Sequence, residues 1–318
     1  MADEMPLDEA SVAGIAQTLA DREQYARSIG LWNIRHAIEE GRVAPDFLAA
    51  IFPIVAGMLN QEGPEVDVAG CLVLLDRDRA IPILLSPECL CLDNPQLEKV
   101  IDALNSAHCP IPHSVLRPLM EQLEPLTGQY PRDSQYAAAV VAYGLNPDPD
   151  TESKLRSLLE SPIHHVAESA AWALVEMNGL GSLWWDICTI VEQRAFDSLS
   201  EPQQRYYAVN SCHFDINNGG LRQCFSNSSG DRYDLAIDGL RAMNAPERVE
   251  ILEAARTVFG PEGPPQERGV RRSIVFNFSS QQKEFLSGLD DRYYASKENV
   301  EMRLSVYAVD HKEAFIRP

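Results

Sequence analysis

No stretch of this 318-residue sequence approaches the roughly 20 consecutive apolar residues that a membrane-spanning helix needs. Its first five residues, Met1-Ala2-Asp3-Glu4-Met5, are acidic, whereas a secretory signal peptide begins with basic residues. These two absences favour a cytoplasmic protein that makes no membrane contact.

The sequence also lacks the short motifs of nucleotide-binding and metal-dependent enzymes. It has no Walker loop and no glycine pattern for a dinucleotide. Its seven cysteines form no regular framework, and an odd number is typical of reduced thiols. Cys89 and Cys91, with a His-Cys pair at 108–109, lack the spacing of a zinc finger, and the His-His pair at 164–165 has no glutamate placed to form a zinc helix. We therefore predict no catalytic residue, no cofactor and no metal site.

Negative charge is in large excess, and it is unevenly distributed. The net charge is −20, of which residues 1–190 contribute −17, with 28 Asp and Glu against 11 Lys and Arg. Residues 191–318 have 19 acidic and 16 basic residues, a balance of −3. The length is typical of two domains, which we place at 1–190 and 191–318. Solubility is the simplest interpretation of the charge.

Direct nucleic-acid binding is not predicted. The basic cluster of Arg268, Arg271 and Arg272 is too small against a net charge of −20 to hold a nucleic acid. It is better suited to contact an acidic partner or the acidic first domain.

The first domain is predicted to be helical. Residues 9–40 form one helix with Ile29 and Trp32 among its apolar positions, and residues 46–59 form a buried helix that Pro53 kinks or divides. Residues 80–85 fit either a short helix or an extended segment. Further helices are predicted at residues 93–104, 112–126, 134–145, 151–159 and 166–177.

The last two of these helices resemble a HEAT-type repeat. Leu155 and Leu158 fill the seam, and small residues such as Ala170 allow close contact between helices. The distance from Ala137 to Ala170 gives a period of 33 residues. Stacked helix pairs of this kind form an α-solenoid, whose surfaces usually bind partners. An irregular helical bundle is the alternative.

The second domain is predicted to be helical as well. Residues 270–278 are its one β-like run, because Ile274, Phe276 and Phe278 alternate, although an extended loop fits equally well. Trp184 and Trp185 are expected at the joint between the domains. Helices are predicted at residues 202–212, 221–227, 233–243, 246–259, 281–294 and 300–315.

The densest cluster of special residues runs from His213 to Asp231. Residues 215–220 are predicted to break a helix that residue 221 restarts, because Asn, Asp and Gly tolerate left-handed backbone angles. One interpretation is a helix-turn-helix corner whose Asn side chains cap free backbone groups. The other is a polar binding site. Its candidate residues are Asp215, Asn217, Asn218, Gly219, Gly220, Gln223, Phe225 and Asn227.

The run from Asn217 to Gly230, Asn-Asn-Gly-Gly-Leu-Arg-Gln-Cys-Phe-Ser-Asn-Ser-Ser-Gly, resembles the signature of the bacterial DNA-mimic protein family. The resemblance continues at 289–294, Leu-Asp-Asp-Arg-Tyr-Tyr, and covers about residues 191–318. Cys224 stands where the family usually has an aromatic residue. The resemblance implies an all-helical domain of unknown function. The best-known member of the family is an acidic dimer that imitates DNA and binds a transcription factor.

The sequence thus predicts an all-α protein, with a HEAT-like α-solenoid domain followed by a helical DNA-mimic-family domain. We expect a non-enzymatic, regulatory protein that binds another protein, with a basic DNA-binding protein as one candidate partner. The family-like domain is nearly neutral, so any mimicry would fall to the acidic residues 1–190. A homo-oligomer also fits. The alternatives are a small-ligand sensor or a hydrolase-like enzyme that uses the Asn-Asn-Gly-Gly corner.

Overall fold

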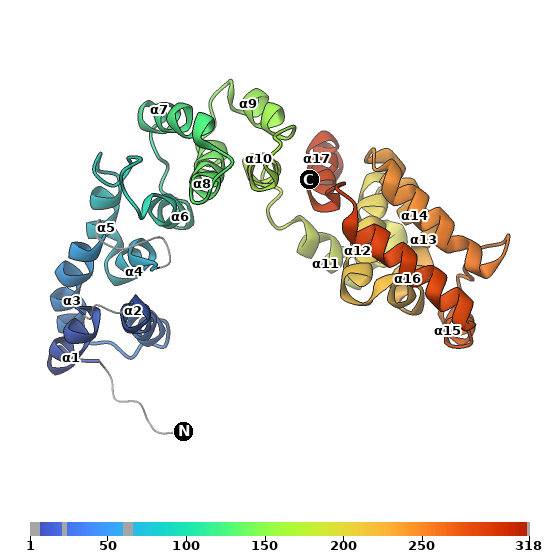
Figure 1. Ribbon diagram of the computed structural model, residues 1–318, viewed down its shortest axis with the longest axis horizontal. Coiled ribbons are helices and arrows are strands. Elements are labelled where there is room, and N and C mark those ends of the chain that lie inside the picture. The colour runs from blue at the N-terminus through green and yellow to red at the C-terminus, as the bar shows by residue number, and fades with distance from the viewer. Residues whose placement is uncertain (1–6, 21–23, 60–65, 317–318) are drawn as a thin grey trace. The chain divides into compact units, whose positions relative to one another are not determined.

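A computed structural model describes residues 7–20, 24–59 and 66–316, so the acidic start at 1–5 lies outside the described residues. Within them the chain is all-α, as predicted, with eighteen α-helices and no β-strand (Figure 1). The chain divides into two compact units, Met1–Ala173 and Leu174–Pro318, and the division falls inside α10 (His164–Met177). No helix of the described ranges combines the length and the apolar character needed to cross a bilayer.

The helices of the first unit alternate between two rows (Figure 1). In one row α2 contacts α4, α4 contacts α6 and α6 contacts α8, while α1 contacts α3 in the other. The first nine helices are α1 (Glu9–Leu19), α2 (Gln24–Glu39), α3 (Pro45–Met58), α4 (Val68–Leu75), α5 (Arg77–Leu84), α6 (Leu97–Ser106), α7 (His113–Leu123), α8 (Arg132–Leu145) and α9 (Thr151–Leu158).

Side-chain bonds between neighbouring helix pairs of this unit join residues about one predicted repeat apart. Arg35 pairs with Asp67, which is 32 residues further along the chain, and the Asn105 amide donates to the carbonyl of Ala138, 33 residues further along. These separations agree with the 33-residue period of the sequence. The HEAT-type identity of the helix pairs remains a prediction.

Small residues bring α8 and α10 close together. A Cβ atom added at Gly144 of α8 would lie 2.6 Å from the Cβ and 3.1 Å from the Cα of Ala173 on α10. Ala139, Ala142 and Ala170 are buried as well. This contact agrees with the expectation that the small residues of these two helices allow close packing.

Three local predictions in the first unit need correction or completion. Residues 9–40 form two helices, α1 and α2, instead of one. Pro53 does not divide α3, because it lies on the exposed face, where water satisfies the carbonyl group that loses its helical partner. The ambiguous run at 80–85 belongs to α5, which begins where the Asp76 carboxylate accepts a hydrogen bond from the Arg79 amide at 3.1 Å.

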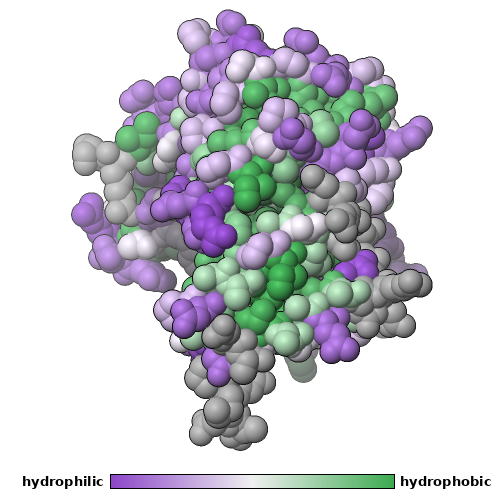
Figure 2. Space-filling view, turned by 90° about the vertical axis from the view of Figure 1, so that its left-hand side faces the viewer, coloured by the Kyte–Doolittle hydropathy of each residue, from purple (hydrophilic) through white to green (hydrophobic). Residues whose placement is uncertain are grey.

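The outer surface of the first helices is largely uncharged. Figure 2 views the molecule from the side where α1 and α3 lie and shows apolar side chains gathered across this face. The exposed side of α3 carries Ala49, Pro53 and Gly57 one turn apart. Asp46, at the start of α3, is the one acidic residue of this helix.

The second unit is organised around one long helix. The helix α12 contacts α13, α15, α16 and α17. Leu221, Cys224 and Phe225 of α12 are fully buried, as is Leu286 of α16. The helices of this unit are α11 (Leu183–Arg194), α12 (Glu201–Ser226), α13 (Tyr233–Ala242), α14 (Pro246–Arg256), α15 (Arg268–Phe276), α16 (Ser280–Ala295), α17 (Val300–Asp310) and α18 (Lys312–Phe315).

The β-like prediction at 270–278 is wrong, since most of this run belongs to α15. Arg271 and Val275, four residues apart, face the core, and Ile274 and Phe276 are exposed. The prediction failed because it considered only apolar residues as candidates for the core, whereas Arg271 is also buried. Of the two tryptophans expected at the domain joint, Trp184 stacks on Tyr207 within the second unit, with ring centroids 5.5 Å apart.

The close contact of α8 and α10 gives a prediction. We expect Gly144→Ala to weaken the packing of the two helices by about 1–3 kcal/mol, because the added methyl group meets backbone atoms that cannot rotate away. Hydrogen-exchange mass spectrometry should show faster exchange in α8 and α10. The control is Gly57→Ala in α3, where an added Cβ meets nothing within 4 Å. Equal protection in the two variants would contradict the packing argument.

Candidate functional site

The predicted corner is a sharp kink within α12 and not a loop between two helices. Asp215, Asn217 and Asn218 are helical, so the predicted break at these residues is wrong. Only the two glycines leave the helical region, Gly219 at φ −167° and Gly220 at φ 75°. Gly220 needs to be glycine, since a positive φ is unfavourable for residues with a side chain. The glycines alone therefore produce the change of direction.

The backbone freed by the kink is capped from a distant helix. The carboxylate of Asp290 on α16 accepts a hydrogen bond from the Leu221 amide at 2.7 Å. The corner interpretation predicted caps from Asn side chains instead. Burial raises the pKa of Asp290, and the Leu221 amide opposes this shift. Asp290 lies in the Leu-Asp-Asp-Arg-Tyr-Tyr segment, but its role was not evident from the sequence.

Two of the predicted site residues, Gln223 and Asn227, meet a third, Asp215, and Ser229 joins them. The Asp215 carboxylate accepts hydrogen bonds from Asn227 Nδ2 at 2.7 Å, Ser229 Oγ at 2.5 Å and Gln223 Nε2 at 3.2 Å. These donors come from the arm after the kink, so Asp215 ties the two arms of α12 together. The hydrogen-bond partners of the Asp215 carboxylate thus come from the same domain, as expected for a network that stabilises the fold.

A buried arginine extends this network. Arg271 is fully buried, and its guanidinium donates to the carbonyls of Phe225 at 2.6 Å and Asn227 at 2.9 Å. It also forms an ion pair with Asp231 at 2.5 Å. Arg271 therefore holds the end of α12 and does not belong to a surface cluster for a partner, contrary to the sequence interpretation.

Phe225 is a core residue and not a surface binding residue. Its side chain is fully buried, with ring centroids 4.7 Å from Tyr233 and 4.8 Å from Phe259. The nearby Cys212 and Cys224 are buried free thiols, with their sulfur atoms 3.0 Å apart. The hydrogen bond between the thiols and their burial raise the pKa of Cys212 well above its usual value, which keeps it protonated and unreactive.

His213 is held in its neutral form. Its Nδ1 lies 2.8 Å from the Tyr293 hydroxyl, and its Nε2 lies 3.0 Å from Asn217 Nδ2. Burial, with a smaller contribution from the nearby Arg248, lowers its pKa to about 4. The guanidinium of Arg248 lies over the ring of Tyr293, 3.9 Å from its centroid. Cys212 faces Cys224 and not His213, so the chain forms no Cys/His nucleophile here.

Of the predicted site, only the outer side of the kink faces solvent. Asn217, Asn218 and Gly219 are exposed, as are Phe214 on the same arm and Tyr294 on α16. The Tyr294 hydroxyl donates to the carbonyl of Ile216 at 2.7 Å. A partner can therefore contact this surface, but Asp215, Gln223 and Asn227 already satisfy one another beneath it.

The comparisons with known proteins agree with this architecture. Residues 197–311 match the family model described as DMP19-like protein. The C-terminal unit contains a DMP19-like domain. The kinked α12, Asp290 on α16 and the buried Arg271 all lie within the matched residues. No curated protein and no solved structure matches the chain.

The match of the DMP19-like domain has a clear limit. It covers 115 of the 318 residues and begins after most of the acidic residues. The resemblance stated from the Asn-Gly-Gly run is thus confirmed for the C-terminal part. The match does not extend to the HEAT-type interpretation of the first 190 residues.

A second candidate site lies on α2, outside the DMP19-like domain. Tyr25, Ile29, Trp32, His36 and Glu39, here called the α2 stripe, follow one another at spacings of four, three, four and three residues. Tyr25 is 76% and Trp32 60% exposed, and Ile29 is 39% exposed. Ile29 and Trp32 were predicted only as apolar positions of a helix, and this pattern alone did not indicate an exposed surface.

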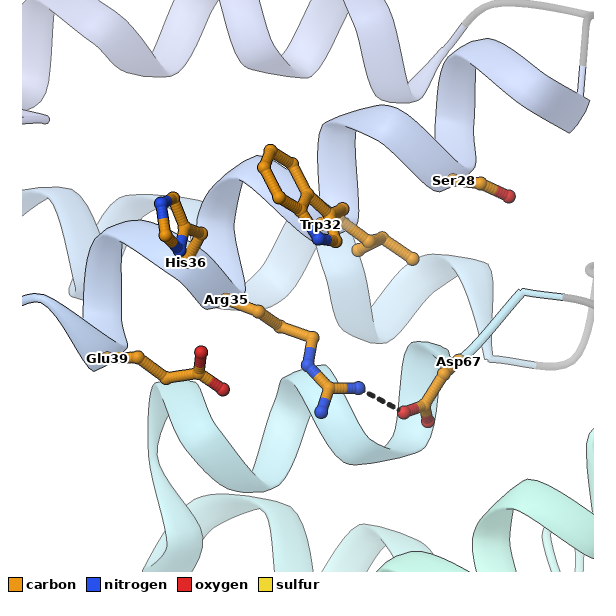
Figure 3. A pocket seen from close by; sticks show the side chains of 7 residues that line it. Ser28, Trp32, Arg35, His36, Glu39 and Asp67 are labelled. Atoms are coloured by element: carbon orange, nitrogen blue, oxygen red, sulfur yellow. Dashed lines mark hydrogen bonds and ion pairs between the residues drawn. The ribbon is translucent and has the colours of Figure 1, made fainter. Parts of the chain in front are cut away.

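The α2 stripe borders a hollow of about 380 Å³ (Figure 3). The Trp32 and His36 rings stack at 5.0 Å, and Arg35 reaches across to the Asp67 carboxylate at 2.5 Å. Asp67 also caps α4 by accepting a bond from the Gly70 amide at 2.8 Å. The residues that line the hollow are Ser28, Leu31, Trp32, Arg35, His36, Glu39 and Asp67.

One cluster of potential metal ligands occurs in the described residues. His164, His165 and Glu168 on the first turns of α10 have ligand atoms within 4.8 Å of one another. The sequence analysis found no suitably placed glutamate, yet Glu168 Oε2 lies 3.0 Å from His164 Nδ1. The two histidines are exposed on a single helical stretch, and we assign no metal to them.

The kink in the DMP19-like domain yields a prediction about its glycines. We expect Gly220→Ala to destabilise the domain by about 1–3 kcal/mol, because its φ is positive and the new Cβ would lie 2.5 Å from the Asp290 carboxylate. Gly288→Ala in α16 is the control, because an added Cβ there meets nothing within 4 Å. Hydrogen exchange in α12 and α16 measures both variants. Similar losses in the two would rule out the special role of Gly220.

The environment of His213 yields a prediction about pH. Its pKa is about 4 in the folded domain and about 6.5 when unfolded, so only the unfolded chain takes up a proton between these values. The free energy of unfolding of the domain therefore has its full value above pH 6.5. It falls as the pH drops toward 4, by up to about 1.4 kcal/mol per pH unit. Hydrogen exchange of α12, corrected for the intrinsic effect of pH, measures this loss. His213→Gln should flatten the pH dependence, and an unchanged slope would assign it to other groups.

Proposed function

We propose that this protein is a non-enzymatic binding protein whose acidic N-terminal unit recognises a basic protein. The partner class is a DNA-binding protein, whose basic groove accepts a surface of negative charge. The observation that carries the proposal is the division of charge. The first unit, residues 1–173, has 26 acidic and 11 basic residues, a balance of −15, against −5 for residues 174–318.

The architecture of the first unit supports a binding role. We propose that its two rows of helices form a HEAT-like solenoid, in which successive helices offer side chains along one continuous surface. Exposed carboxylates are present on successive parts of the unit, which suits a partner with several basic side chains. Examples are Asp46, Asp78, Glu88, Asp93 and Glu121.

The corner of the DMP19-like domain is a weaker candidate for a ligand site or an enzyme. Three donors from within the domain occupy the Asp215 carboxylate, and the Asp290 carboxylate caps a backbone amide. His213 uses both ring nitrogens in contacts with Tyr293 and Asn217. These groups stabilise the kink and leave little chemistry for a substrate.

The proposal predicts binding that depends on salt and on the acidic unit. The full chain is immobilised in a lysate of its own organism at about 50 and about 300 mM NaCl, and captured proteins are identified. We expect a basic DNA-binding protein whose affinity falls at least about tenfold between the two conditions. Neutralising five carboxylates, with Asp46→Asn, Asp78→Asn, Glu88→Gln, Asp93→Asn and Glu121→Gln, should weaken binding as strongly.

A matched control separates the site from net charge alone. It neutralises five exposed carboxylates of the second unit, with Glu262→Gln, Glu267→Gln, Glu284→Gln, Asp291→Asn and Glu313→Gln, and should bind normally. Equal losses of binding in both variants would show that the net charge of the protein, and not the surface of the first unit, determines the affinity. A partner lost on Asn218→Ala at either salt concentration would move recognition to the exposed corner of the DMP19-like domain.

A further inference from the structure

We infer that the α2 stripe is a docking site for an amphipathic helix of the partner protein, one that carries a basic residue at the end of its apolar seam. This inference rests on the proposed function and deepens it, since it names the surface and the form of the partner. The evidence comes from the spacing, the exposure and the charges of the stripe.

The spacing of the stripe fits a helix and not an extended peptide. Spacings of four, three, four and three residues place Tyr25, Ile29, Trp32, His36 and Glu39 along one seam of α2. This is the pattern by which one helix offers its side chains to another that lies along it. An extended strand has a period of two residues and would need an exposed sheet edge, and the described residues form no sheet.

The apolar residues of the stripe resemble an interface and not a solvated surface. Tyr and Trp are enriched among the residues that contribute most to binding, whereas a solvated helix face is normally polar. Trp32 stands at the middle of the seam, fixed by its stack on His36, with the hollow beside it and the buried Leu31 in the wall of the hollow. A partner side chain of moderate size fits this hollow and contacts the indole.

The charges at the end of the stripe call for a basic partner residue. Arg35 is already paired with Asp67, so the positive charge of the hollow is balanced. Glu39 is exposed at the last position of the seam, whereas the neighbouring Glu40 is already paired with Arg42. A lysine or arginine of the partner helix therefore meets Glu39 at this end of the stripe.

A second copy of this chain is a poor occupant. The first unit of the second copy has a net charge of −15, and docking would bring this charge close to the acidic residues of the first copy. Tyr25 and Glu39 at the two ends of the stripe are fourteen positions apart in α2, or about 21 Å at 1.5 Å per residue. The partner helix should therefore present about four turns, which is a common length for a recognition helix.

A display experiment on the full-length protein tests this assignment directly. A phage library of four-turn helices, randomised at the seam and its flanking positions, is selected on the wild-type chain and counter-selected on Trp32→Ala. We expect enrichment of helices with apolar residues at seam positions and Lys or Arg at one end. No enrichment over the counter-selection, or enrichment of acidic or non-helical sequences, would overturn the inference.

Affinities of the best enriched peptide then test the two ends of the stripe. We expect at least about tenfold weaker binding by Trp32→Ala, a typical loss for a central aromatic residue. Trp185→Ala is the matched control, because Trp185 is 72% exposed in the second unit and should not matter. Glu39→Gln should weaken binding of the basic peptide but not of a peptide with Gln at its basic position. Equal effects on both peptides would contradict the ion pair.

The outcomes distinguish this inference from the proposed function. If Trp32→Ala and Glu39→Gln capture the salt-sensitive partner as well as the wild type does, the acidic unit still binds it and the α2 stripe is not the site. If the peptides bind the stripe but no basic partner is captured, the docking site stands and the proposed partner class fails. A dimer in light scattering that Trp32→Ala dissociates would replace the partner helix with a second copy.

Discussion

The C-terminal unit depends on the reversal of α12 at Gly219 and Gly220. A helix that turns sharply leaves amide groups without partners in its second arm, and buried amides without partners are costly. The Asp290 carboxylate meets this requirement by accepting from the Leu221 amide at the start of the new arm. The Asp215 carboxylate joins the new arm to the old one through side-chain hydrogen bonds. Leu221 and Phe225 of the new arm are fully buried, and Phe225 packs against Tyr233 and Phe259.

Local patterns in the sequence predicted the fold class because helices depend mainly on local periodicity. Most helices follow from apolar residues at helical spacing, although none was predicted at α4, α11 or α15. The Asn-Gly-Gly run correctly marked the change of direction. The failures involve tertiary contacts. The run at 270–278 looked like a strand because Ile274, Phe276 and Phe278 alternate, but the guanidinium of Arg271 is buried. Two of the carbonyls that it binds lie more than 40 residues earlier in the chain.

The candidate site was only partly predictable for the same reason. Composition identified Asp215, Gln223 and Asn227 as a group, and the structure brings them together. Composition could not show that the polar atoms of these residues bond to one another, because this depends on the course of the chain after Gly220. A different gap occurred on α2, where Trp32 was predicted as an apolar helix position without an assignment to the core or the surface. Periodicity shows that residues share a face, but not whether another element covers that face.

The division of charge limits what the DMP19-like domain implies about function. A family resemblance transfers fold more safely than activity, because function depends on particular surfaces. Imitation of DNA requires a field of negative charge, and here most of that charge lies in a unit that the family match does not reach. The acidic unit also offers an exposed aromatic seam, and DNA has no equivalent of this feature. Charge would guide a basic partner to this unit, whereas contacts with Trp32 and its neighbours would select one helix among many.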